Sequence, residues 1–209
     1  MHKITGLFGI PIYQSHIDIS EGLREHIRSQ EFHRFGKDNG SCTRDVHLLE
    51  QPELADLRRE IMRHVEFYVR DELAVAAGIE FYLPNSWCTR HLTGDESERH
   101  NHSNGLVSGV VYTDCDEQSG EFRFFKDYTW LNLWPSALDL DSVGYNEFNS
   151  KYWAIQPRVG DIILFPSHLA HGVSPSTSPN HRHCVAFNLF ARGTIGLGSN
   201  PEITRLDLN

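Results

Sequence analysis

The sequence predicts a mainly β fold with N-terminal helices, in which the strands form a double-stranded β-helix, the jelly-roll or cupin-like barrel. Apolar residues recur at helical spacing before Gly78, whereas short runs of β-branched and aromatic residues, separated by turn residues, follow it. In this second region His100 and His102 stand one residue apart, and His171 lies far along the chain. Histidines that meet from two distant strands are typical of a metal held in the mouth of a small barrel.

The region before Gly78 is expected to be mostly helical. Residues 1–12 are mildly apolar and indicate an opening strand. A serine at the start of residues 20–31 is a favourable N-cap for a helix, and glycine and aspartate over residues 33–45 indicate a loop. A long helix is expected to begin at Pro52, a favoured first-turn residue, and to end at Gly78. Its apolar stripe would be Leu54, Leu57, Ile61, Val65, Tyr68, Val69, Leu73 and Ala76.

The region after Gly78 is expected to form an antiparallel barrel. A long aromatic insert over residues 127–150 interrupts it and is expected to help form the mouth of a substrate site. We therefore expect one domain over residues 1–209, with helical support over 1–80 and the barrel over 81–209. The expected strands are 86–92, 98–102, 106–113, 121–126, 151–156, 161–165 and 183–191.

Composition excludes some classes of partner. Lysine and arginine number 19 against 28 aspartates and glutamates, so the net charge of −9 argues against a nucleic-acid-binding surface. No apolar run is long enough to cross a membrane. Four scattered cysteines without a Cys-x-x-Cys pair, together with no apolar leader, indicate free thiols in a cytoplasmic setting. The helices before residue 80 could support a homodimer.

The histidine pattern points to a metal centre. Imidazole nitrogen binds Fe(II), zinc, nickel and copper. His100 and His102 would point the same way on a strand, because strand side chains alternate between two faces. With His171 they would occupy one side of a metal ion and leave positions for substrate and O₂, whereas a structural zinc site closes with four ligands. Most histidines are ordinary surface or core residues, and we expect this of His91, His168, His181 and His183.

The segment before His171 is more specific than the His-x-His pair. Gly160-Asp161 indicates a turn, the apolar run Ile162-Ile163-Leu164-Phe165 a buried strand, and Pro166 its end. His171 would then stand at the start of the next strand, where a ligand can be aimed inward.

Further candidates lie near this pattern. Arg182, eleven residues past His171, is a permanently charged group that binds a carboxylate through two hydrogen bonds. Tyr112 could donate its hydroxyl to the same carboxylate, or could simply be a packed barrel aromatic. Arg90 would point into the barrel and touch substrate or co-substrate. Trp130 could contact substrate, although it and Trp134 could equally be packing residues.

The chain resembles the Fe(II)- and 2-oxoglutarate-dependent oxygenase superfamily, and within it the prolyl-4-hydroxylase-like branch found in marine bacteria and phages. The resemblance covers roughly residues 86–190, half of the chain, and its closing segment is the most specific part. The matching segments are Ser86-Trp87, Gly94, His100-Asn101-His102-Ser103-Asn104, Val107-Ser108-Gly109-Val110-Val111-Tyr112, Ser119-Gly120-Glu121-Phe122-Arg123-Phe124, Gly160-Asp161-Ile162-Ile163-Leu164-Phe165-Pro166-Ser167, His171-Gly172-Val173-Ser174-Pro175 and Arg182 through Phe187-Asn188.

This resemblance implies a double-stranded β-helix that binds Fe(II), with 2-oxoglutarate and O₂ as co-substrates. In the superfamily, oxidation of 2-oxoglutarate to succinate and CO₂ is coupled to hydroxylation of an unactivated C–H bond. Carried onto this chain, His100 and His171 would be the two histidine ligands, and Arg182 would bind the far carboxylate of 2-oxoglutarate. The substrate would be a small molecule or a peptide, by analogy with prolyl hydroxylases.

One residue departs from the superfamily pattern. His102 stands where the wider superfamily has aspartate or glutamate, although the branch that this chain resembles tends to share His-x-His. A neutral ligand leaves the site one unit more positive. The third ligand would be His102, which its position favours, or else an acid from Asp95, Asp114 or Asp116, or water.

Two other functions fit parts of the sequence. The spacing from Gly94 to His102 and from Pro166 to His171 is similar to the two cupin motifs, which would give a three-histidine dioxygenase or isomerase without 2-oxoglutarate. Against this interpretation, no glutamate follows His102 at cupin spacing, and a cupin does not need Arg182. A non-catalytic ligand-binding barrel is the third hypothesis.

Overall fold

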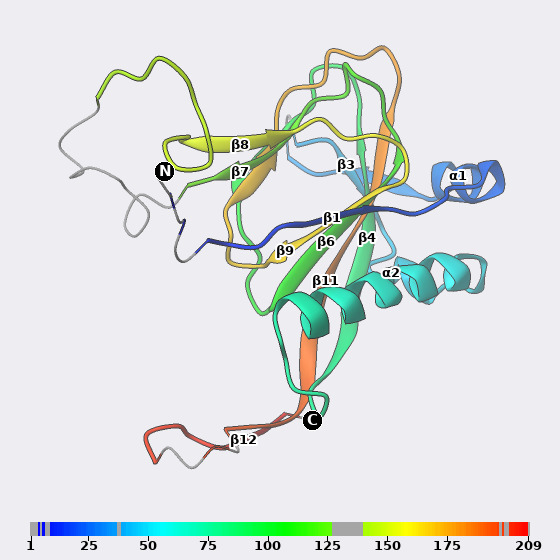
Figure 1. Ribbon diagram of the computed structural model, residues 1–209. Coiled ribbons are helices and arrows are strands. Elements are labelled where there is room, and N and C mark those ends of the chain that lie inside the picture. The colour runs from blue at the N-terminus through cyan, green and yellow to red at the C-terminus, as the bar shows by residue number, and fades with distance from the viewer. Residues whose placement is uncertain are drawn as a thin grey trace.

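The computed structural model forms two antiparallel sheets, shown in Figure 1. The larger sheet has the strand order β1-β9-β6-β11-β4-β3-β2, with β12 paired to β11, and the smaller has the order β5-β10-β7-β8. This arrangement confirms the predicted mainly β, double-stranded β-helix class. The residues described are 4, 6, 9–36, 39–126, 140–196, 198 and 201–208. The strands are β1 (Tyr13–His16), β2 (Phe32–Arg34), β3 (Ser41–Thr43), β4 (Glu80–His91), β5 (Ser97–His100), β6 (Val107–Asp114), β7 (Phe122–Phe125), β8 (Tyr152–Ile155), β9 (Asp161–Pro166), β10 (His171–Val173), β11 (Arg182–Ile195) and β12 (Leu206–Leu208).

The larger sheet separates two apolar clusters, because successive side chains of its strands point to opposite faces. On one face, Val111 and Val185 pack in a cluster with Leu57 and Ile61 of helix α2 (Ala55–Phe67). The other face packs against the smaller sheet. The buried members of that second cluster are Val110, Tyr112, Phe122, Phe124, Ile163, Phe165, Leu169, Val173 and Cys184. A side chain on β6 or β11 therefore faces either the helices or the space between the sheets, according to its position.

The first predicted helix is confirmed, and the second is shorter than predicted. Helix α1 (Glu21–Arg28) begins after Ser20, whose hydroxyl oxygen accepts a hydrogen bond from the Leu23 amide. Two 3₁₀ turns (Leu48–Glu50 and Pro52–Leu54) precede α2, and a π-helical turn (Tyr68–Glu72) follows it.

The chain leaves the second helix before Gly78. Ala74 has the left-handed φ of 52° and reverses the chain there. The guanidinium of Arg70 donates to the carbonyls of Val75, Ala76 and Ile79, which satisfies acceptors beyond the helix end.

The first 80 residues also contribute β2 and β3, which the sequence did not indicate. The expected loop over residues 33–45 contains β2 and β3, which extend the larger sheet beside β4. The first strand among the described residues is Tyr13–His16, just after the range expected for the opening strand, and Pro11 before it has no amide to donate to a ladder. The expected helical support over residues 1–80 was therefore incomplete.

The seven predicted strands after Gly78 are all present, although β4 begins at Glu80 rather than 86 and β11 extends to Ile195 rather than 191. The strand expected to start at His171 is β10, and β12 was not predicted. Within the aromatic insert, residues 127–139, and with them Trp130 and Trp134, lie outside the described residues, and residues 140–150 form turns. Across the described residues, no helix is both long and apolar enough to span a bilayer.

Candidate metal centre and anion site

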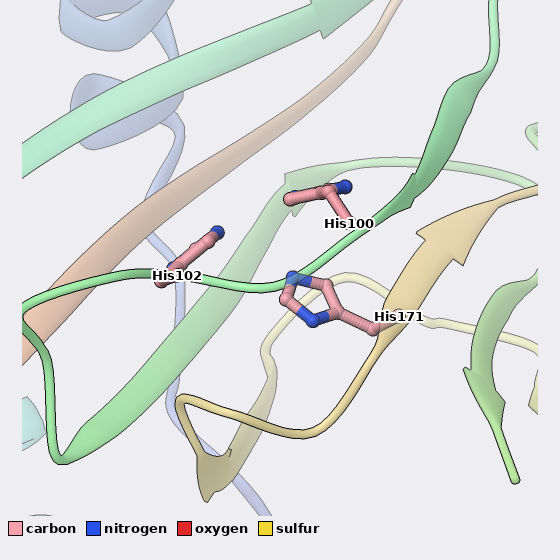
Figure 2. A group of neighbouring side chains, drawn as sticks. All are labelled: His100, His102 and His171. Atoms are coloured by element: carbon pink, nitrogen blue, oxygen red, sulfur yellow. The ribbon is translucent and has the colours of Figure 1, made fainter. Parts of the chain in front are cut away.

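Three histidine side chains, two from neighbouring strands and one from the segment that follows β5, meet at one point (Figure 2). His100 ends β5 and His171 begins β10, and the two are directly paired across these strands. His102 lies in the turn after β5, where its amide donates to the Ser167 carbonyl at 3.0 Å. One nitrogen from each ring lies within 4.8 Å of the others, and the rings face one another in Figure 2. Such a cluster could hold a metal ion.

Hydrogen bonds leave the same nitrogen of each ring free. Nδ1 of His100 lies 2.7 Å from the Glu98 carbonyl, and Nδ1 of His171 lies 2.9 Å from the Leu169 carbonyl. Nδ1 of His102 lies 2.6 Å from Oδ1 of Asn188. These oxygens only accept, so each Nδ1 carries the hydrogen and each Nε2 presents a lone pair. Neutral imidazole with its other nitrogen hydrogen-bonded is the form that ligates metals in proteins.

Burial keeps two of these rings neutral. His171 is 4% exposed, and burial lowers its pKa to about 3, with a further contribution from His100 and His102. Burial also lowers the pKa of His102, although the hydrogen bond to Asn188 opposes the shift. His100 is exposed, so the cluster lies at the edge of the protein rather than in a sealed interior.

The three acids considered as a replacement for His102 are all engaged elsewhere. Asp95 binds the guanidinium of Arg34, Asp114 binds two arginines of α1, and Asp116 binds Ser178 and Asn180. By contrast, His102 lies in the cluster with His100 and His171. Of the other histidines, His168 and His181 are exposed, whereas His91 and His183 are buried.

Arg182, at the start of β11, is a buried cation without an acidic partner. It is 2% exposed, and among the described residues no carboxylate pairs with it. Its Nη2 donates to the Tyr112 hydroxyl at 3.5 Å and to the Cys184 sulfur at 3.6 Å, while its Nε has no partner. A buried charge in this state is costly unless an anion completes it. The surroundings of Arg182 are therefore those of an anion-binding site.

Tyr112 and His91 complete the surroundings of Arg182. Tyr112 is fully buried on β6, and burial raises the pKa of its hydroxyl, which stays protonated and able to donate. His91 accepts from Nη1 of Arg182 at 3.4 Å, and its Nε2 lies 3.2 Å from the Ser97 hydroxyl. Burial lowers the pKa of His91 to about 3, and the charge of Arg182 adds to the shift, so this partner is neutral. Nothing in the residues next to His91 in the sequence indicated this role.

Alternation along β11 places Arg182 and the histidines on one side of the larger sheet. Arg182, Cys184 and Asn188 occupy even positions, and Asn188 contacts His102. Arg90 pairs with His183, at an odd position, and its guanidinium lies over the Phe32 ring at 4.4 Å. The expectation that Arg90 points into the barrel is wrong, because the position that faces inward at this end of β4 belongs to His91.

Comparison with known proteins identifies the class. The family model described as "Putative 2OG-Fe(II) oxygenase" matches residues 85–188. None of the curated proteins searched matches the chain.

Solved structures share the fold at low identity. HygX from Streptomyces hygroscopicus, solved with nickel and 2-oxoglutarate bound, is 16% identical with a TM-score of 0.60, over 86% of this chain and 82% of that chain. A Pseudomonas putida prolyl-4-hydroxylase is 15% identical with a TM-score of 0.58, over 88% and 94%. The epimerase SnoN from nogalamycin biosynthesis is 15% identical with a TM-score of 0.56, over 89% and 82%. At these identities the likeness establishes the fold.

The matched segment contains all three histidines of the cluster as well as Tyr112 and Arg182, and the free Nε2 atoms and the unpaired guanidinium suit a metal and an acidic co-substrate. The chain belongs to the 2OG-Fe(II) oxygenases, enzymes that use Fe(II), 2-oxoglutarate and O₂.

Proposed function

We propose that this enzyme hydroxylates an unactivated C–H bond of a small-molecule or peptide substrate, and that residues 1–209 act as one oxygenase unit. His100, His102 and His171 would hold Fe(II), and Arg182 with Tyr112 would bind the far carboxylate of 2-oxoglutarate. Two features together carry the proposal. Three Nε2 atoms are free to bind a metal, and the buried guanidinium of Arg182, which has no carboxylate partner among the described residues, lies on the same side of the larger sheet.

Each residue would have a distinct task. Bound Fe(II) would supply the redox chemistry that links 2-oxoglutarate and O₂. The Nδ1 hydrogen bonds hold the three rings in place, so that little conformational entropy is lost when metal binds. The fork of Arg182 would accept a carboxylate through two hydrogen bonds, and the Tyr112 hydroxyl would donate a third. Burial of both groups would exclude water from this end of the co-substrate.

The net reaction balances with the two co-substrates that the family uses. One oxygen atom of O₂ enters the substrate as a hydroxyl group and the other enters succinate, while the first carbon of 2-oxoglutarate leaves as CO₂. Four free cysteines, two of them buried, fit the reducing cytoplasm that we propose as the setting.

The proposal is tested by the conversion of 2-oxoglutarate to succinate. With added Fe(II), the wild-type enzyme should form succinate slowly even without substrate, and His171→Ala should abolish it. His168→Ala is the matched control, because this neighbouring histidine is exposed, and it should retain wild-type turnover. Absence of both turnover and 2-oxoglutarate binding in the wild type would favour a three-histidine cupin-type enzyme instead.

The reaction outcome needs a separate measurement, since the fold is shared with an epimerase. Small molecules and peptides that accelerate succinate formation should be incubated under ¹⁸O₂. Hydroxylation predicts one ¹⁸O atom in the product, whereas epimerisation predicts none.

A further inference from the structure

We propose that Asn188 is a positioning residue, which fixes the tautomer and orientation of His102 and so allows a histidine to serve where the wider superfamily has an acid. The inference rests on the proposed function, because it takes His102 as the third metal ligand. It concerns the residues around His102 that neither the family match nor the likeness to solved structures assigns.

The orientation of the Asn188 amide follows from its partners. Asn188 lies in β11 and is buried, with its Nδ2 donating to Oδ1 of Asn85 at 3.0 Å. Its Oδ1 therefore faces His102, where it lies 2.6 Å from Nδ1. An amide oxygen only accepts, so the hydrogen must be on Nδ1 of His102. The lone pair of His102 is then on Nε2, the nitrogen that faces the other two rings.

Two serines extend this contact into a network from three strands. Ser108 of β6 places its Oγ 2.8 Å from Oδ1 of Asn188 and 2.8 Å from Oγ of Ser167, which follows β9. The same Oγ lies 3.0 Å from Nδ1 of His102. A Cβ at Gly105 would lie 2.7 Å from the Ser167 hydroxyl, so only glycine lets the turn after His102 approach this closely.

His102 depends on a side chain where the other two histidines do not. Nδ1 of His100 and Nδ1 of His171 each donate to the backbone carbonyl two residues earlier in the chain. His102 takes its acceptor from Asn188, 86 residues away. A carboxylate ligand has no tautomers, whereas an imidazole that binds through Nε2 must hold its proton on Nδ1. A histidine at position 102 therefore needs an acceptor that an acid would not need.

The affinity for Co(II) measures how far Asn188 supports metal binding by His102, and the measurement needs no turnover. Loss of the partner that orients a ligating histidine typically weakens metal binding about 10- to 100-fold, so Asn188→Leu should raise the Co(II) dissociation constant by that factor. Asn188→Asp keeps an acceptor and should bind Co(II) at least as tightly as the wild type. Asn180→Leu is the matched control, since Asn180 is exposed and binds Asp116, and it should leave Co(II) affinity unchanged.

The same substitution in a His102→Asp protein distinguishes a positioning role of Asn188 from a merely structural one. In His102→Asp the ligand has no tautomer to fix, so adding Asn188→Leu should change the Co(II) dissociation constant by less than about twofold. Equal affinity of Asn188→Leu and the wild type would overturn the inference, as would an equal loss in both backgrounds. If the wild type itself binds no Co(II), the metal site of the proposed function fails instead.

Discussion

Two clusters of buried charge lie on opposite faces of the larger sheet. We call one complete, because its acid is paired with cations, and the other incomplete, because no carboxylate among the described residues pairs with its cation. Asp114, at the end of β6, receives hydrogen bonds from Arg24 and Arg28 of α1 and lies 3.3 Å from Nδ1 of His183. Among the residues that the structure describes, Arg182 on the opposite face has the neutral partners Tyr112, His91 and Cys184. The complete cluster fastens a helix to the sheet, whereas the incomplete one has a cation with neutral neighbours. Burial alone does not distinguish a charged residue with a structural role from one in a functional site. Whether the charge is paired with an opposite charge does distinguish them.

A shift in strand register separates the two clusters. Cys184 pairs with Tyr112, but His183 pairs with Asp114, so the alignment of β11 and β6 slips by one residue. In a regular strand Tyr112 and Asp114 would share a face, and the acid would lie on the side of Arg182. The slip turns Asp114 toward α1 instead. Arg182 is thereby left without Asp114 as a partner.

The largest expected effect on stability comes from removing the acid of the complete cluster. Asp114→Asn keeps the shape of the side chain but removes the buried acid that the two arginines share, so that each keeps the exposed Glu21 as its acidic partner. Because both arginines are partly exposed, we expect a loss of about 3 kcal/mol in the free energy of unfolding, at the low end for a broken buried ion pair. Urea denaturation measures this, and binding of 2-oxoglutarate to the folded protein should be unchanged. A weaker co-substrate affinity at full stability would mean that the two clusters are not separate.

A substitution in the incomplete cluster is expected to weaken co-substrate binding and to leave stability nearly unchanged. Arg182→Met removes the charge but keeps an apolar stem, and should weaken 2-oxoglutarate binding by about 2–4 kcal/mol, or roughly 30- to 1,000-fold. Removal of an unpaired buried charge offsets lost packing, so the free energy of unfolding should stay within about 1 kcal/mol of the wild type. Calorimetric titration of the metal-loaded protein with 2-oxoglutarate measures the first effect, and urea denaturation the second. Unchanged co-substrate affinity would remove Arg182 from the site.

The sequence predicted the chemistry of the site better than its surroundings. The three histidines and Arg182 could be found because each begins, ends or adjoins a strand whose apolar pattern is clear. Asn188 and His91 were missed because their partners lie 86 and 91 residues away, and local periodicity does not carry strand register.

The errors have the same origin. Arg90 was expected to face inward because its strand was recognised without its register against β11. Asp114 was a candidate ligand because nothing local marks the slip beside it. The second helix was predicted too long because its end depends on hydrogen bonds from Arg70 to a loop, rather than on a glycine.

The smallest of the three effects is a change in the pH dependence of stability, and it concerns His91, the neutral partner of Arg182. His91 faces the charges of Arg182, Asp95 and Arg34, and burial with these neighbours holds its pKa at about 3 in the folded protein. In the unfolded chain the pKa returns to about 6.5. Between these values the unfolded state binds the additional proton, so this contribution to stability is complete above pH 6.5 and falls as the pH drops toward 3.

At pH 5 the expected loss from His91 is about 2 kcal/mol relative to pH 7. His91→Asn retains an acceptor for Arg182 but cannot titrate. Between pH 7 and pH 5 its free energy of unfolding should therefore fall by about 2 kcal/mol less than that of the wild type. Urea denaturation of the metal-free protein at both pH values gives the comparison, and taking the difference between pH values removes any fixed cost of the substitution. Equal pH dependence in the two proteins would mean that His91 is protonated beside Arg182. A charged imidazole there would repel the guanidinium and would itself need an anion, so the cluster would demand more negative charge than one carboxylate supplies.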